Sequence, residues 1–151
     1  MTQEDKDLLL KDLCARLPYG VKISWRNDEV ENKVFELSSI TSKKYESYKK
    51  DGKELAVNGE YIEWRLNENK MGKFYKFATL CDYIKPYLRP IDSMNVDDTL
   101  KFTDICLRHA GKPETESLVD EILEFYCSRH LDFHGLIPKG LALEAPEDMY
   151  K

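Results

Sequence analysis

Hydrophobic residues near the start of the chain recur at the spacing of one helical face. This stripe consists of Leu9, Leu10, Leu13 and Leu17. Thr2 is a suitable N-cap, acidic residues occupy the first turn, and Pro18 with Gly20 stops the helix. The pattern therefore predicts a helix over residues 3–17 that turns its leucines toward the core.

The C-terminal half shows two further helical patterns. Asn95 suits the cap of a helix over residues 96–110, and Gly111 suits its end. Pro113 suits the opening of a second helix that runs to about residue 133. The buried stripe expected on this second helix is Leu118, Val119, Ile122, Leu123 and Tyr126. Together the two patterns predict an antiparallel helical hairpin.

Between residues 20 and 80 the hydrophobic period changes to two, which is typical of half-buried strands. "VKISWR" at 21–26 alternates apolar and polar residues, and "KVFELSSI" at 33–40 is its expected partner. In "ELAVNGEYIEWRL", Asn58-Gly59 suits a two-residue hairpin turn that would pair Leu55 with Ile62. "KFYKFATL" at 73–80 can add another strand. The prediction is a small, twisted antiparallel sheet of four or five strands, which can curl into a partial barrel.

Prolines mark the link between the sheet and the helices. In "IKPYLRPIDSM" at 84–94, Pro86 and Pro90 enforce extended backbone and exclude a helix. After the last helix, the apolar residues of "GLIPKGLALEAPEDMYK" predict a tail that packs back on the body. The fold class is therefore α+β. We expect a single compact domain over 1–151, with a helix-plus-sheet part at 1–88 and a helical part at 89–151.

Composition and charge narrow the classes of function. Of the 151 residues, 42% are hydrophobic and 34% charged, which is typical of a folded protein with a charged exterior. No apolar run approaches the ~20 residues that span a bilayer. The acidic N-terminus does not resemble a signal peptide, so the expected location is the cytoplasm. The net charge of −5 argues against bulk affinity for nucleic acid, and only residues 41–76 are clearly basic, at +3.

Cysteine and histidine gather in "YCSRHLDFH" at 126–134, and "CLRH" at 106–109 repeats the Cys-x2-His spacing. In the predicted hairpin, Cys106 lies level with about residue 119, roughly 12 Å along the axis from Cys127. The two pairs are therefore too far apart to bind one zinc ion together. Two-ligand chelation by His130 with Cys127 or His134 stays open, although a packed histidine is the commoner outcome. No cofactor is indicated.

The segment "NKMGKFYKF" interleaves lysines and aromatic residues. The candidate residues are Lys70, Lys73, Phe74, Tyr75 and Lys76. On a sheet face such residues can stack the bases of a single strand and hold its phosphates. The same pattern fits an ordinary strand that buries its rings and exposes its lysines.

Three stretches resemble a family of small uncharacterised proteins of gut anaerobic bacteria, often found in prophage and mobile-element regions. The resemblance rests on "LLLKDLCARLPYGVK", "IKPYLRPIDSM" and "HLDFHGLIPKGLALEAPEDMYK", about a third of the chain. It implies an accessory or interaction protein rather than a housekeeping enzyme, and carries over no functional residue. The family's final motif more often has Tyr-Arg where this chain has Phe133-His134, which weakens His134 as part of a shared function.

No glycine-rich phosphate loop, G-x-S-x-G elbow, H-E-x-x-H or C-x-x-C motif occurs in the sequence. The leading hypothesis is therefore a non-enzymatic cytoplasmic accessory module that binds another protein. Binding is expected at an exposed sheet edge or where the helices meet the sheet. The alternative is weak binding of single-stranded nucleic acid through residues 70–77. A second alternative is a small enzyme that uses Cys127 or His130 in a concave pocket.

Overall fold

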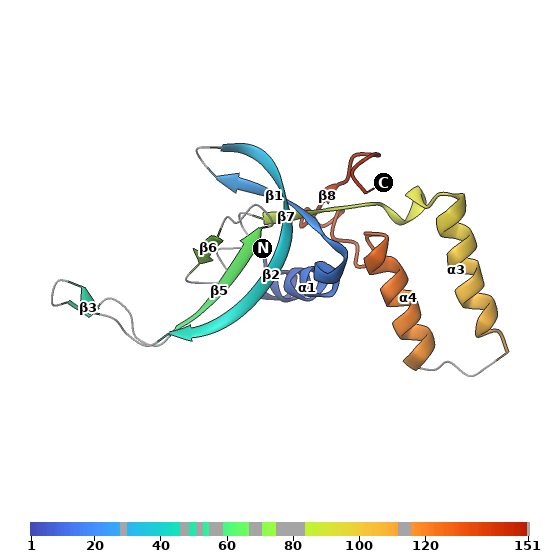
Figure 1. Cartoon of the computed structure of the whole chain (residues 1–151), viewed down its shortest axis with the longest axis horizontal. Helices are drawn as coiled ribbons and strands as arrows, with labels where there is room; N and C mark the ends of the chain where they lie inside the picture. The colour runs from blue at the N-terminus through green and yellow to red at the C-terminus, as the bar shows by residue number, and fades with distance from the viewer. Residues whose placement is uncertain are drawn as a thin grey trace. The chain divides into compact units, whose positions relative to one another are not determined.

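The computed structural model divides the chain into two compact units, Met1–Pro86 (unit 1) and Tyr87–Lys151 (unit 2). The residues that it describes are 1–27, 30–45, 49–50, 53–54, 59–66, 71–74, 84–111 and 116–150. An N-terminal helix, an open sheet and C-terminal helices confirm the predicted α+β class (Figure 1). The expectation of a single domain stays a prediction.

Unit 1 opens with helix α1, Gln3–Arg16. It begins where expected because Thr2 Oγ1 accepts a hydrogen bond from Asp5 N–H, while the Asp5 carboxylate accepts one from Thr2 N–H. One 3₁₀ turn, η1 (Leu17–Tyr19), follows the helix. Gly20 then takes φ +69°, and a Cβ there would lie 3.3 Å from the Glu36 carboxyl group, so glycine suits this turn.

The leucine stripe of α1 is buried as predicted at its centre. Leu9 and Leu13 are fully buried, whereas Leu10 and Leu17 are half-buried. Asp12 and Arg16 on the same helix are also fully buried, which the hydrophobic pattern did not predict.

The sheet of unit 1 has the strand order β6-β5-β2-β1-β7, with every neighbouring pair antiparallel. The strands are β1 (Lys22–Asn27), β2 (Val30–Tyr45), β5 (Gly59–Leu66), β6 (Met71–Phe74) and β7 (Ile84–Leu88). Ser24 pairs with Val34 on one side and Lys85 on the other, which confirms the predicted pairing of 21–26 with 33–40. The sheet is open rather than closed into a barrel. Figure 1 shows β2 as a long, curved strand. Two short strands, β3 (Lys49–Lys50) and β4 (Lys53–Glu54), pair separately.

The predicted pairing of Leu55 with Ile62 is wrong. Ile62 in β5 pairs with Ser42 of β2 on one side and with Phe74 of β6 on the other, so both of its backbone edges are occupied. β2 runs for 16 residues, twice the length expected, and its second half provides the partner. Leu55 and Asn58 themselves lie outside the described residues.

Unit 2 begins in the second half of β7 and continues through the 3₁₀ turn η2 (Ile91–Ser93) to helices α3 (Val96–Arg108) and α4 (Glu116–Ser128). Extended backbone is confirmed in the proline-bounded segment, apart from the single turn of η2. The helical hairpin is also confirmed, and Figure 1 shows α3 and α4 side by side and antiparallel.

Helix α4 ends five residues earlier than predicted. His130 adopts φ +53°, the left-handed conformation that glycine usually supplies at a helix end. His130 N–H donates to the Cys127 carbonyl and Leu131 N–H to the Tyr126 carbonyl, the two hydrogen bonds of a Schellman motif. His130 therefore closes the helix.

The buried face of α4 also differs from the prediction. Val119 and Leu123 are 43% and 40% exposed, so they do not belong to the core. Phe125, which the predicted stripe omitted, is buried in their place. Leu118, Ile122 and Tyr126 pack against the buried cluster as predicted. The predicted stripe was too wide because neighbouring apolar pairs at 118–119 and 122–123 fit either of two helix faces.

The C-terminal tail packs on unit 2 as predicted. Strand β8 (Leu143–Glu144) pairs in parallel with the end of β7. Ala145 N–H donates to the Leu88 carbonyl over 2.8 Å, and the Tyr150 hydroxyl donates to the Tyr87 carbonyl over 2.8 Å. Two of the three segments that carry the family resemblance are thus hydrogen-bonded to each other.

Candidate functional site

Helix α3 is fixed at its start by a network of carboxylates and guanidinium groups. Asn95 and Asp98 form a capping box, with Asp98 N–H 2.9 Å from Asn95 Oδ1. The buried Asp98 carboxylate also accepts a hydrogen bond from Arg89, at 2.8 Å. Arg129 Nε lies 3.3 Å from the other oxygen, an ion pair without hydrogen-bond geometry. These contacts hold the first turn of α3 on the rest of unit 2.

Aromatic packing joins α3 to α4. The ring centroid of Phe102 on α3 lies 5.6 Å from that of Phe125 and 5.8 Å from that of Tyr126, both on α4. Ile105, Phe125 and Leu131 form the buried centre of this cluster. The inner face of α3 is therefore used to hold the hairpin together.

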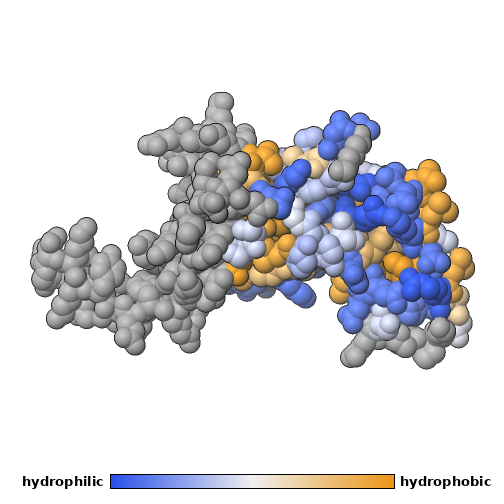
Figure 2. Space-filling view, viewed as in Figure 1, coloured by the Kyte–Doolittle hydropathy of each residue, from blue (hydrophilic) through white to orange (hydrophobic). Residues whose placement is uncertain are grey.

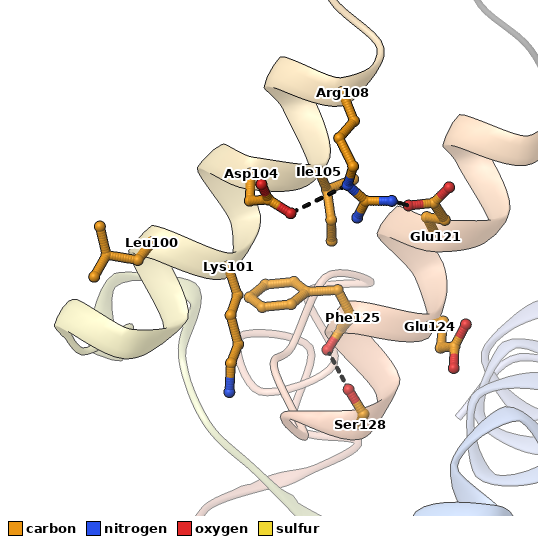
Figure 3. A pocket seen from close by; sticks show the side chains of 9 residues that line it. All are labelled: Leu100, Lys101, Asp104, Ile105, Arg108, Glu121, Glu124, Phe125 and Ser128. Carbon is orange, nitrogen blue, oxygen red and sulfur yellow. Dashed lines mark hydrogen bonds and ion pairs between the residues drawn. The ribbon is translucent and has the colours of Figure 1, made fainter.

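A groove of about 490 Å³ lies between the two helices. Figure 3 shows Ile105 and Phe125 at its centre, with Leu100 directed away from α4 at its lip. Charged side chains border it: Lys101, Asp104 and Arg108 from α3, and Glu121 and Glu124 from α4. A hydrophobic floor with a charged border is the arrangement found in protein-protein interfaces.

The border of the groove is held by ion pairs between the helices. Arg108 bridges Asp104 at 3.1 Å and Glu121 at 2.8 Å, as the dashed lines in Figure 3 show. His109 Nε2 lies 3.1 Å from the other Glu121 oxygen. The hydrogen bond to His109 lowers the pKa of Glu121 below its ordinary value, partial desolvation opposes this, and the charge of Arg108 lowers the pKa further. Glu121 therefore favours its charged form.

The outer face of α3 is apolar and exposed. Val96, Leu100 and Leu107 are 76%, 65% and 68% exposed. At 3.6 residues per turn they fall within about 40° of one another, on the side opposite Phe102 and Ile105. Figure 2 shows hydrophobic side chains over α3, beside strongly hydrophilic ones. Helix α3 thus has two apolar faces, of which only one is packed against the described parts of unit 2.

The exposed apolar face of α3 was not predicted from the sequence. A signal was present, because a 13-residue helix needs only one apolar stripe to pack, and the residues from Val96 to Leu107 contain two. The sequence pattern predicted a buried stripe only for the second helix. The surplus apolar residues of the first helix were assigned no function.

A second hollow, of about 330 Å³, lies where the tail meets the segment after β7. It is lined by Arg89, Pro90, Ser93, Asn95, Glu144, Ala145, Pro146, Glu147 and Tyr150. Arg89 is the one cation among the described residues that line it, and it is already bonded to Asp98 and to the Ser93 carbonyl. This hollow lies between two of the segments that carry the family resemblance, but most of its polar side chains already form hydrogen bonds within unit 2.

The cysteine and histidine candidates are part of the packing of unit 2. Cys127 and His130 are buried, and the His130 ring stacks on Tyr150 with 3.7 Å between centroids. His134 is half-buried, and its ring centroid lies 4.0 Å from that of Phe133. Among the described residues, no three His, Cys, Asp or Glu side chains could hold a metal ion together. Neither Cys127 nor His130 lines either of the two hollows. Their placement gives no support to a metal-binding or catalytic role.

The structure describes the candidate nucleic-acid-binding residues of segment 70–77 only in part. Lys73 and Phe74 belong to strand β6, of which the backbone alone is described. Lys70, Tyr75 and Lys76 lie outside the described residues. Single-strand binding through residues 70–77 stays a prediction from the sequence.

No protein-family model, curated protein or solved structure among those compared matches the chain. In the part of the chain that the structure describes, no helix is long and apolar enough to cross a membrane.

Proposed function

We propose that this protein is a non-enzymatic accessory protein of the cytoplasm that binds another protein through its α3–α4 hairpin. The observation that carries the proposal is the exposure of Val96, Leu100 and Leu107 on one face of α3. Full burial of such a side chain contributes roughly 1.5–3 kcal/mol, so three together provide a substantial gain on docking. Single exposed apolar residues are ordinary, whereas several on one helix face are typical of an interaction surface.

The groove adds to this surface. Leu100 belongs both to the outer face of α3 and to the lip of the groove, so the two areas are continuous. Arg108 and Glu121 are already held in place by their ion pair, and a partner would not have to order them. The sequence had placed the binding surface on the sheet or beside it, and the proposal places it on the helices.

Crosslinking in native lysate tests the proposal. The wild-type protein is compared with the double variant Leu100→Glu/Leu107→Glu, and crosslinked partners are quantified by mass spectrometry. Both positions are exposed, so the fold should persist, and the far-UV circular dichroism spectrum should be unchanged. We expect the partner of the wild-type protein to be lost from the double variant.

The matched control is Val34→Glu, because Val34 is 45% exposed in unit 1 and lies outside the hairpin. This variant should retain the partner at the wild-type yield. Equal yields from the double variant and the wild-type protein would contradict the proposed site. A screen that found catalytic turnover, with no partner crosslinked, would contradict the proposed function itself.

A further inference from the structure

We infer that the partner binds through a single helix that lies along α3. This partner helix carries apolar residues at alternating three- and four-residue spacing, and lysine or arginine beside them. This inference rests on the proposed function and specifies the ligand of the same site. It follows from the spacing of the exposed residues and from the charges around them.

The outer face of α3 has the spacing of a coiled-coil seam. Val96, Leu100, Thr103 and Leu107 are separated by four, three and four residues, a seam of about 16 Å. Thr103 fits this seam because its hydroxyl donates to the Thr99 carbonyl at 2.7 Å. Its polar atom is satisfied within α3, and its methyl group can join the apolar row. Such a row interlocks best with the same spacing on a second helix.

The groove beside this seam extends the contact. Leu100 lies on the seam and also lines the lip of the groove, so a helix on the seam lies beside the groove's charged border. The partner helix would thus pack on the side of α3 that faces away from Ile105, and its flanking side chains would reach that border. An extended strand would find no sheet edge at this surface, because both walls of the groove are helices.

The charges favour a basic partner. Residues 87–151 contain thirteen acidic and seven basic side chains, a net charge of −6. Of the described residues that line the groove, two are cations, and both are already engaged, Lys101 with Asp97, and Arg108 with Asp104 and Glu121. Glu124 is exposed and forms no ion pair with the residues that the structure describes. A cation on the partner would therefore find a free carboxylate at the groove.

The same charges disfavour a second copy of this chain as the occupant. Pairing α3 with α3 would bring together two copies of residues 87–151, each with a net charge of −6. In the antiparallel arrangement, Asp97 of one copy would also lie beside Asp104 of the other, since both border the same side of the seam.

Two synthetic helical peptides test the inference. Both carry leucine at alternating three- and four-residue spacing over three heptads, with lysine at the flanking positions of one and glutamate at those of the other. Fluorescence anisotropy of the labelled peptide measures binding. We expect the lysine peptide to bind at least tenfold more tightly than the glutamate peptide, and Leu107→Glu to abolish its binding.

The variant Glu124→Lys tests the local charge. It should weaken the lysine peptide severalfold and strengthen the glutamate peptide. The matched control is Asp92→Lys, which makes the same change of net charge at an exposed position of unit 2 outside the groove. It should shift both affinities by a smaller factor. A lysine peptide of scrambled order, with no apolar face, should not bind.

Contrary results separate the inference from the proposed function. Equal binding of both peptides, lost in both cases with Leu107→Glu, would overturn the basic partner and leave the interaction surface standing. Binding of the lysine peptide that survives Leu107→Glu would mean attraction by charge alone and would overturn the inference. A dimer in sedimentation that Leu107→Glu dissociates would identify a second copy as the occupant. Failure of both peptides would also overturn the helical partner, and the crosslinking experiment would then decide the proposed function by itself.

Discussion

Helices α1 and α3 begin in the same way and differ in which residues they bury. Each starts with a capping box and has a carboxylate that is fully removed from solvent. In α1 the buried carboxylate, Asp12, is neutralised within the helix by Arg16, whose guanidinium lies 2.7 and 2.9 Å from its two oxygens. In α3 the buried carboxylate, Asp98, is neutralised from outside the helix by Arg89 and Arg129.

The apolar residues of the two helices differ in the opposite sense. Leu9 and Leu13 of α1 are fully buried, whereas Leu100 and Leu107 of α3 are mostly exposed. Whether a helix buries a charged or an apolar side chain therefore depends on the elements that pack against it. We propose that the buried face of α1 stabilises unit 1, whereas the outer face of α3 serves binding, and variants of the two helices test this difference.

The largest effect is expected for Asp12→Ala. Arg16 would remain buried without the Asp12 carboxylate, and breaking a buried pair costs about 3–5 kcal/mol in free energy of unfolding. Urea unfolding followed by tryptophan fluorescence measures this loss, because Trp25 and Trp64, the two tryptophans of the chain, belong to unit 1.

Two further variants control this result. Asp7→Ala alters an exposed carboxylate of the same helix and should change stability by less than about 0.5 kcal/mol. Asp12→Leu/Arg16→Met replaces the pair with apolar groups and should recover most of the loss. A cost below about 1 kcal/mol for Asp12→Ala would show that the pair does not stabilise α1.

A second pair of variants compares leucines on the two helices. Leu13→Ala removes a fully buried side chain and should cost about 2–5 kcal/mol. Leu107→Ala removes an exposed one and should change stability by less than about 0.5 kcal/mol. Thermal unfolding followed by circular dichroism measures both. Similar losses for the two variants would mean that the outer face of α3 stabilises the fold, which would contradict its assignment as a binding surface.

A smaller loss of about 1–3 kcal/mol is expected for Asp98→Ala. The variant removes the capping box of α3, but the side chains of Arg89 and Arg129 are 20% and 29% exposed and can be hydrated by water. Amide hydrogen exchange in the first turn of α3 should accelerate, and Asp104→Ala, at an exposed position, is the control. A loss as large as that of Asp12→Ala would remove the distinction between the two buried carboxylates.

The smallest effect is a change in pH dependence with Glu121→Gln. The pKa of Glu121 is lower in the folded protein than its ordinary value of 4.5, so the unfolded chain binds the proton first as the pH falls. The stabilising contribution is therefore present above about pH 4.5 and is lost as the pH falls through the folded-state pKa. Glu121→Gln should flatten the fall in stability on acidification. Identical acid titrations for Glu121→Gln and the wild-type protein would show that the contacts with His109 and Arg108 contribute nothing.

Much of the fold was predictable because its signals are local. Thr2 and Asn95 act within one helical turn, and Pro86 restricts its own backbone and that of its neighbour. Where the decision depended on residues far away in the sequence, prediction failed. β5 pairs with β2 rather than with the segment just before it, because the stability of a strand depends on the partner that covers it.

The site was less predictable than the fold. Cysteine and histidine were candidates because they are common metal ligands and catalytic groups. In the structure Cys127 and His130 are buried, and His130 closes helix α4. The surplus leucines of α3 carried the more useful signal. An apolar residue in a sequence does not reveal whether its own fold or a second molecule will cover it.

By itself the sequence determined where helices α1 and α3 start, which segments are extended, and that the class is α+β. Capping, proline restriction and hydrophobic period act over a few residues and need no knowledge of the rest of the chain. The tertiary structure decided which strand β5 joins, which carboxylates are buried, and which face of α3 is left exposed. These outcomes depend on the elements that reach each surface, because desolvation and packing are properties of the assembled fold.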